Sequence, residues 1–162
     1  MSKHLLIAAV LILISALSAT AQTASAQDKD QITEVTLERT GCFGTCPIYR
    51  VTLRRDGTLI YEGIRFVSML GTYKGQAYDF ARLAEFILAQ DYFNLKDDYW
   101  IQGTDLPSTI TSVVRADKRK TVTNNAGIGP VGLWGIEMVI DGIWRSAKLE
   151  KVVEPPARPR SK

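Results

Sequence analysis

The chain has 162 residues, of which 46% are hydrophobic and 23% are charged, and its formal net charge at pH 7 is +3. This length and composition are typical of one globular domain and exclude the collagen-like and disordered classes. The positive charge is far smaller than that of a protein with a basic nucleic-acid-binding face, so we expect no nucleic-acid partner.

The N-terminal segment has the pattern of a secretory signal peptide. A positively charged start is followed by the apolar run Leu5–Leu17 and by the second of two small-residue cleavage sites, Ala24-Ser25-Ala26. We therefore expect residues 1–26 to be removed on export and the mature chain to begin at Gln27. An uncleaved anchor is the alternative, but the apolar run is shorter than the roughly 20 residues that cross a bilayer. We expect a periplasmic or extracellular protein with no stable membrane span after cleavage.

His4 is the only histidine in the sequence, and it lies in the segment that we expect to be removed. Histidine is the usual general base near neutral pH and the commonest metal ligand. A mature chain without histidine excludes Ser-His-Asp and Cys-His catalysis, and also His-ligated zinc, iron and haem. We therefore expect no metal site, no cofactor and no catalytic residues.

Three segments in which apolar and polar residues alternate, 32–40, 48–55 and 58–64, predict three β-strands. Between the second and third segments, Asp56-Gly57 supplies the positive φ angles of a tight hairpin turn.

The outward faces of the first two predicted strands carry opposite charges. Glu34 and Glu38 lie on the first strand, and Arg50 and Arg54 lie on the second. Cross-strand ion pairs explain these charges. We prefer this explanation to a ligand-binding basic patch, because exposed sheet faces are normally charged.

In the rest of the chain, the apolar residues change between helical and strand spacing. This change predicts, in order, a glycine-rich loop at 71–75, a helix over 79–90, a long connection over 91–108, strands over 109–115 and 119–124, and a helix over 131–148. The order β-β-β-α-β-β-α indicates an α+β domain, an antiparallel sheet of about five strands with two helices packed on one face. We place this domain at residues 27–150 and a disordered, basic, proline-rich tail at 151–162.

Cys42 and Cys46 lie between the first two strands, and in an exported protein such a pair normally forms a disulfide. The intervening residues, which include Gly44, let the Cα atoms approach to the roughly 4.4–6.8 Å that a bridge requires. So small a loop contributes only about 2 kcal/mol of stability. A redox pair is the alternative, since Arg39 or Arg50 could lower a thiol pKa, but no helix is predicted to begin there. A metal site would lack two further ligands.

The loop Cys42-Phe43-Gly44-Thr45-Cys46-Pro47 is followed by Asp56-Gly57-Thr58 and Tyr61-Glu62-Gly63. This pattern resembles a family of bacterial exported domains of unknown function, whose signature is a Cys-Phe-Gly-Thr-Cys-Pro loop before a hairpin. The resemblance covers most of residues 32–145. It implies a shared fold and a location in the bacterial envelope, and the family has no established activity that could be transferred.

The last predicted helix carries an apolar face and a polar face. Trp134 and Met138 lie one turn apart on the polar face, among Glu137, Asp141 and Arg145. This position makes the pair a candidate for an exposed apolar contact. The long connection before the fourth strand must also pack somewhere, and we prefer the interpretation in which it covers the pair.

The connection itself contributes Tyr99 and Trp100. Together with Trp134 and Met138 they form a possible binding surface, provided that the four side chains converge on one open face.

Asp97, Asp98 and Asp105 lie in or beside the same connection. Paired carboxylates near aromatic side chains are the composition of a sugar-cleaving site. Aspartates are also ordinary turn residues, and we prefer that explanation.

These observations favour a non-catalytic exported envelope protein that binds or scaffolds another protein or a surface polymer. The alternatives are a thiol-disulfide protein that uses Cys42 and Cys46 and a carbohydrate-active enzyme that uses the loop carboxylates.

Overall fold

The described chain forms β-strands, two α-helices and the loops between them. The computed structural model describes residues 31–103 and 105–153, so the predicted signal peptide and residues 154–162 of the predicted tail lie outside the described residues. The elements, in chain order, are β1 (Ile32–Arg39), β2 (Ile48–Arg54), β3 (Thr58–Arg65), β4 (Gly71–Gln76), α2 (Phe80–Ala89), the 3-10 turn η1 (Tyr92–Asn94), β5 (Asp98–Tyr99), β6 (Ser108–Arg115), β7 (Lys118–Asn125), α3 (Val131–Ser146) and β8 (Glu150–Lys151).

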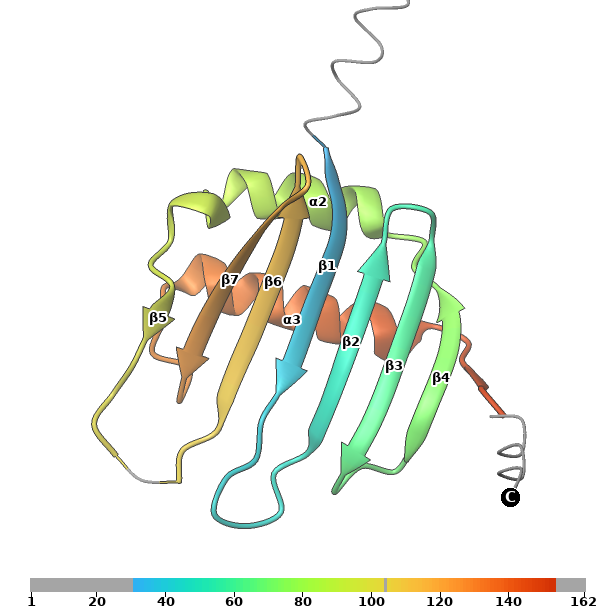
Figure 1. Ribbon diagram of the computed structural model, residues 1–162, viewed down its shortest axis with the longest axis horizontal. Coiled ribbons are helices and arrows are strands. Elements are labelled where there is room, and N and C mark those ends of the chain that lie inside the picture. Colours follow the sequence, from blue (N-terminus) through green and yellow to red (C-terminus); the bar gives the residue numbers. More distant parts are fainter. Residues whose placement is uncertain (1–30, 104, 154–162) are drawn as a thin grey trace, which may run out of the picture.

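The strands form one 8-stranded sheet in the order β5-β7-β6-β1-β2-β3-β4-β8 (Figure 1). Neighbouring strands are antiparallel, with the exception of the parallel pair β5 and β7. β1 therefore lies inside the sheet, between β2 and β6. The predicted α+β class is confirmed, but the estimate of about five strands is too low, because the sequence pattern did not predict β4, β5 and β8.

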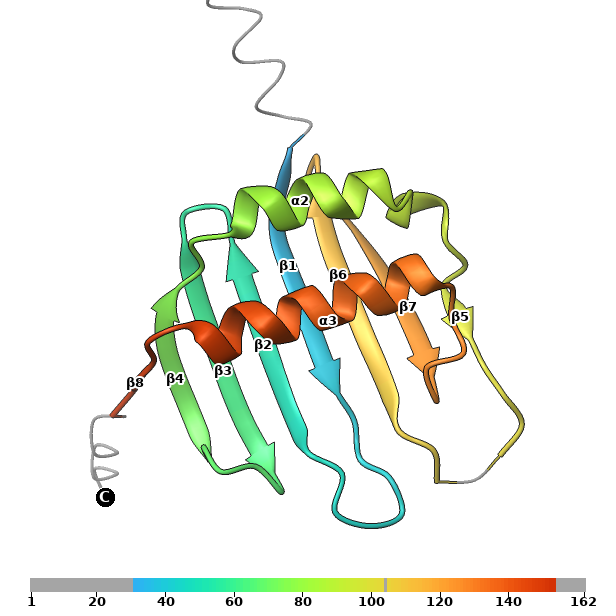
Figure 2. The ribbon, with the colours of Figure 1, turned by 180° about the vertical axis from the view of Figure 1, so that it is seen from behind.

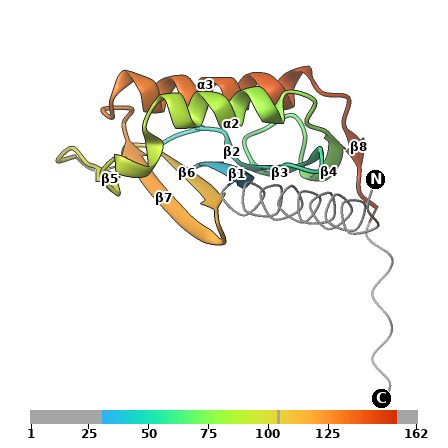
Figure 3. The same ribbon diagram turned by 90° about the horizontal axis from the view of Figure 1, so that it is seen from above.

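Both helices lie on one face of the sheet (Figures 2 and 3), and the core lies between the helices and the strands. Every second residue of the central strands points into this core, as alternation requires. The helices add residues at helical spacing. Fully buried members of the core include Val35, Leu37, Val51, Leu53, Leu59, Leu83, Ile87, Leu133, Ile136 and Ile140.

The opposite face of the sheet carries the predicted ion pairs. The register of β1 and β2 aligns Glu34 with Arg54 and Glu38 with Arg50. The guanidinium of Arg54 donates to Glu34 at 3.0 Å, and that of Arg50 donates to Glu38 at 2.7 Å. The cross-strand pairing is confirmed, and exposed pairs of this kind contribute at most about 1 kcal/mol each.

α3 is the longer helix, and it follows the predicted segment 131–148 closely. Beyond it, β8 pairs with β4 at the boundary between the predicted domain and the predicted tail. Among the residues that the structure describes, neither α2 nor α3 combines the length and the apolar composition that crossing a membrane requires.

Candidate functional site

The loop between β1 and β2 is closed by a disulfide. Cys42 and Cys46 are bonded, and their Cα atoms lie 5.6 Å apart. Gly44 adopts a φ of 142°, a positive value that glycine reaches more easily than residues with a Cβ. Phe43 is 88% exposed at the tip of the loop, so the bridged loop presents an aromatic side chain to solvent.

Two further loops meet the bridged loop at the same end of the sheet, which is the lower end in Figure 1. Thr40 and Ser108 exchange two hydrogen bonds, from the Thr40 N–H to the Ser108 carbonyl at 3.0 Å and from the Ser108 N–H to Thr40 Oγ1 at 2.8 Å. The N–H of Ala126 donates to the Pro107 carbonyl at 2.9 Å. We call the segments 40–47, 105–108 and 126–130 the disulfide end.

A cavity of about 460 Å³ lies at the disulfide end, within the size range of small-molecule sites. Its walls include Cys46 from the bridged loop and Trp134 from α3. They also include the charged side chains of Arg39 and Glu137. The cavity therefore combines an indole ring with a guanidinium and a carboxyl group.

Arg39, at the end of β1, holds a buried polar cluster beside this cavity. Its guanidinium donates to Asp141 Oδ2 at 2.8 Å and to Thr109 Oγ1 at 2.6 Å, and it lies 3.7 Å from Glu137 Oε2. Glu137 and Asp141 are only 2% and 6% exposed. Two carboxyl groups one turn apart on a helix repel each other, and burying both requires the cation that Arg39 supplies.

Asp141 is satisfied within the protein. In addition to Arg39, it accepts hydrogen bonds from the Tyr49 hydroxyl at 2.7 Å and from Trp144 Nε1 at 3.0 Å. The rings of Tyr49 and Trp144 pack with centroids 5.4 Å apart. Burial, together with the bond to Asp141, raises the pKa of Tyr49 above its usual value. This part of the cluster has a structural role.

Glu137 has its own set of partners. Its Oε1 accepts a hydrogen bond from Asn124 Nδ2 at 2.8 Å, and Asn124 Oδ1 in turn accepts the N–H of Gly129 at 2.8 Å. Burial raises the pKa of Glu137 above its usual value of 4.5, although the bond from Asn124 and the charge of Arg39 oppose the shift. Of the two acids, Glu137 is the one that lines the cavity.

The structure corrects the predicted polar face of α3. Glu137 and Asp141 are buried, whereas Trp134 and Met138 are 53% and 48% exposed. The interpretation in which the long connection covers Trp134 and Met138 is therefore wrong. Sequence reasoning missed the buried acids because their partners come from distant strands. The available signal was a pair of like charges one turn apart beside the apolar positions of the same helix.

The four aromatic and methionine residues proposed as a binding surface have different surroundings. Trp134 lines the cavity, and Met138 lies one turn further along α3. Tyr99 belongs to β5 at the sheet edge and packs against the core, and Trp100 is 65% exposed beside it. Among the described residues that line the cavity, Trp134 is the single member of this set.

The three loop aspartates take different positions along the connection. Asp97 forms an ion pair with Lys120, which also donates to the Leu95 carbonyl at 2.7 Å. Asp98 begins β5. Asp105 adopts a φ of 66°, and its carbonyl accepts the N–H of Phe43 at 3.1 Å. None of these aspartates is among the residues that line the cavity at the disulfide end.

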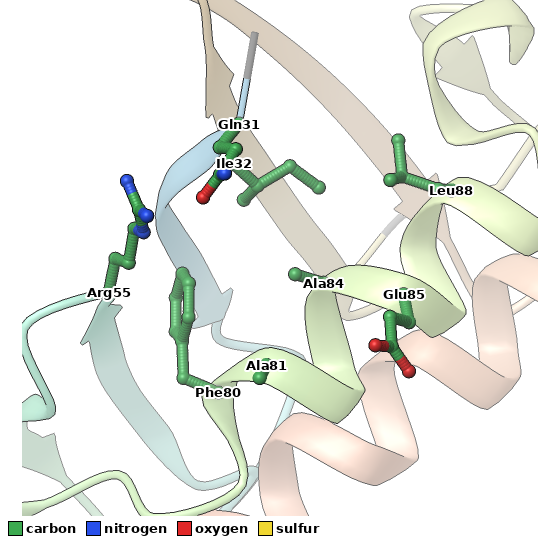
Figure 4. A pocket seen from close by; sticks show the side chains of 8 residues that line it. All are labelled: Gln31, Ile32, Arg55, Phe80, Ala81, Ala84, Glu85 and Leu88. Carbon is green, nitrogen blue, oxygen red and sulfur yellow. The ribbon is translucent and has the colours of Figure 1, made fainter. Parts of the chain in front are cut away.

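A second cavity, of about 290 Å³, lies between α2 and the start of β1 (Figure 4). Its lining is mostly apolar and includes Ile32, Phe80 and Leu88. Arg55 and Glu85 stand at its sides (Figure 4). This hollow offers an apolar contact surface with a charged side chain on each side.

Across residues 31–103 and 105–153, no group of three or more histidine, cysteine or acidic side chains is placed to hold a metal ion.

Comparison with known proteins identifies the domain. A family model described as a domain of unknown function, DUF6438, matches residues 33–144. That range begins in β1 and ends in α3, so it includes the sheet core, the bridged loop and the buried cluster. The comparison with curated proteins found no match. The chain belongs to the DUF6438 family of domains of unknown function.

Proposed function

We propose that the protein is a non-catalytic binding domain that is exported to the bacterial envelope and holds another protein or a surface polymer at its disulfide end. One observation carries this proposal: an open cavity lined by Trp134 of α3 lies beside the bridged loop, whose tip exposes Phe43. Phe43 is 88% exposed and Trp134 is 53% exposed. Exposed aromatic groups on rigid loops are the usual anchors of a binding surface.

The chemistry of the cavity favours binding over catalysis. Glu137 is its acidic wall residue, while Asp141 is engaged by three donors. The usual mechanism of glycoside hydrolysis requires two carboxyl groups that face the scissile bond. The cysteines are bonded to each other, so neither offers a thiolate nucleophile.

Envelope binding tests this proposal. The complete sequence is expressed, and the protein purified after export is immobilised and incubated with a bacterial envelope fraction. We expect the wild-type protein to retain envelope material, and we expect Phe43→Ser and Trp134→Ala to retain none. The matched control is Tyr78→Ser, because Tyr78 is 86% exposed and lies between β4 and α2, away from the disulfide end. Absence of any retained partner, or turnover on a panel of hydrolase substrates, would contradict the proposal.

A thiol-disulfide activity is the alternative function. The bridged loop connects two strands, and neither cysteine stands at the start of a helix, which removes the usual cause of a low thiol pKa. A measured reduction potential separates the two functions. A value below about −300 mV marks a structural bridge, and a potential near those of disulfide oxidoreductases, about −120 to −270 mV, would support the alternative.

A further inference from the structure

The cavity at the disulfide end presents both a cation and an acid to a ligand. Arg39 and Glu137 line it, and Asp141 already accepts a charged hydrogen bond from Arg39 at 2.8 Å. An anionic ligand would meet the carboxyl of Glu137, and a cationic ligand would meet the guanidinium of Arg39. A neutral ligand that both donates and accepts hydrogen bonds avoids both conflicts.

Trp134 supplies a flat apolar surface beside these polar groups. It lines the cavity and is 53% exposed, so it lies where the cavity meets solvent. Pro47 and Pro107 add apolar walls. A ring with a C–H face and a border of hydroxyl groups fits this arrangement, because the C–H face stacks on the indole while the hydroxyls reach Arg39 and Glu137. A saccharide has this chemistry.

The polar groups are fixed before a ligand arrives. Arg39 is held by Thr109 and Asp141, and Glu137 is held by Asn124. Side chains that are already ordered lose little entropy on binding. We propose that the cavity binds one sugar ring of an uncharged saccharide, with Trp134 as the stacking surface and Arg39 and Glu137 as hydrogen-bonding partners. This inference rests on the proposed function and assigns its partner as a polymer of sugars.

The test uses three tetrasaccharides of similar size, titrated into the full exported protein labelled with ¹⁵N. Cellotetraose is neutral, a galacturonate tetramer is anionic and a glucosamine tetramer is cationic. We expect cellotetraose to shift the indole resonance of Trp134 and to bind roughly tenfold more tightly than either charged tetramer. Trp134→Ala should weaken this binding by roughly tenfold or more. The matched control Trp100→Ala should leave it unchanged, because Trp100 is exposed but does not line the cavity.

Three results would overturn the inference. One is tighter binding of a charged tetramer, and another is equal loss of binding in the two tryptophan variants. The third is a Trp134 response to a neutral tetrapeptide without a response to any of the saccharides. If none of the saccharides binds while the protein still retains envelope material, only the assignment of a saccharide is refuted. If the protein also retains no envelope material, the proposed function is refuted as well.

Discussion

Replacing Arg39 by methionine removes the cation from the buried cluster and keeps most of the apolar length of the side chain. The variant loses the bonds to Asp141 at 2.8 Å and to Thr109 at 2.6 Å, and it leaves two buried carboxyl groups one turn apart on α3. Breaking a buried pair costs about 3–5 kcal/mol. The Arg39 side chain is 27% exposed, and Asp141 keeps its bonds from Tyr49 and Trp144. We therefore expect the lower end of this range, about 3 kcal/mol.

Urea unfolding followed by circular dichroism measures this loss. For an m value of about 1–3 kcal/mol/M, the unfolding midpoint should fall by about 1–3 M. Arg50→Met is the matched control, because Arg50 also lies on a strand and pairs with Glu38 at 2.7 Å, but it is 48% exposed. That variant should lose at most about 1 kcal/mol. Equal losses in the two variants would refute the reasoning that the Arg39 cluster is a buried ion-pair network.

The loss in Arg39→Met should also depend on pH. Burial already raises the pKa of Glu137, and removal of the Arg39 charge raises it further. The folded variant then binds a proton at Glu137 more readily than the unfolded chain does, so its stability falls as pH rises. The gap between variant and wild type should be smaller at about pH 5 than at about pH 7, and a gap that is constant with pH would show that no carboxyl is involved.

Three further predictions concern stability. Glu137→Gln removes a carboxyl group whose pKa is raised in the folded protein. In the wild type, the stability that comes from this raised pKa is fully present below pH 4.5 and is lost as pH rises through the folded pKa. The stability of the variant relative to wild type should therefore increase with pH above 4.5, and urea titrations that show a constant difference across this range would contradict the prediction. Replacing Cys42 and Cys46 together by alanine should lower the free energy of unfolding by only about 2 kcal/mol because the loop is short, and loss of the fold in the circular dichroism spectrum would show a larger role for the bridge. Gly63→Ala should destabilise the protein by about 1–3 kcal/mol, because the added Cβ would overlap a backbone carbonyl of the following turn. Gly142→Ala should stabilise it by about 0.5–1 kcal/mol, because Gly142 is an exposed helical position where the added Cβ meets no other atom. Thermal melts that rank the two variants in the opposite order would contradict this packing.

The elements with a clear period were predicted correctly. The alternation over β1 to β3, the Asp56-Gly57 turn and the apolar stripe of α2 each depend on local sequence. The prediction failed at β4, where Gly71 and Gly75 indicated a loop. Gly75 is a close-approach site, because a Cβ there would lie 2.7 Å from Leu149 Cδ2 and from the Lys148 carbonyl. β5 and β8 have only two residues each, which is too short for any period.

The candidate site was predicted only in part. The bridged loop followed from its own composition, because Cys42 and Cys46 are close in sequence. The buried cluster did not follow, since Arg39 and Asp141 are 102 residues apart and helical spacing alone places charged residues toward solvent. Tertiary partners from β1, β2 and β7 reversed that placement for Glu137 and Asp141. Periodicity describes one element at a time, so it cannot predict such a reversal.

The central place of β1 in the sheet has a consequence for the order in which the chain can become structured. Its first neighbour, β2, follows immediately, but its other neighbour is completed only when the chain has reached Arg115. The ion partners of Arg39 come later still, on α3. A nascent polypeptide that stops before α3 therefore exposes both the apolar side of the hairpins and an uncompensated cation. Folding must wait for distant segments, which makes it slow compared with that of a helical bundle of the same length.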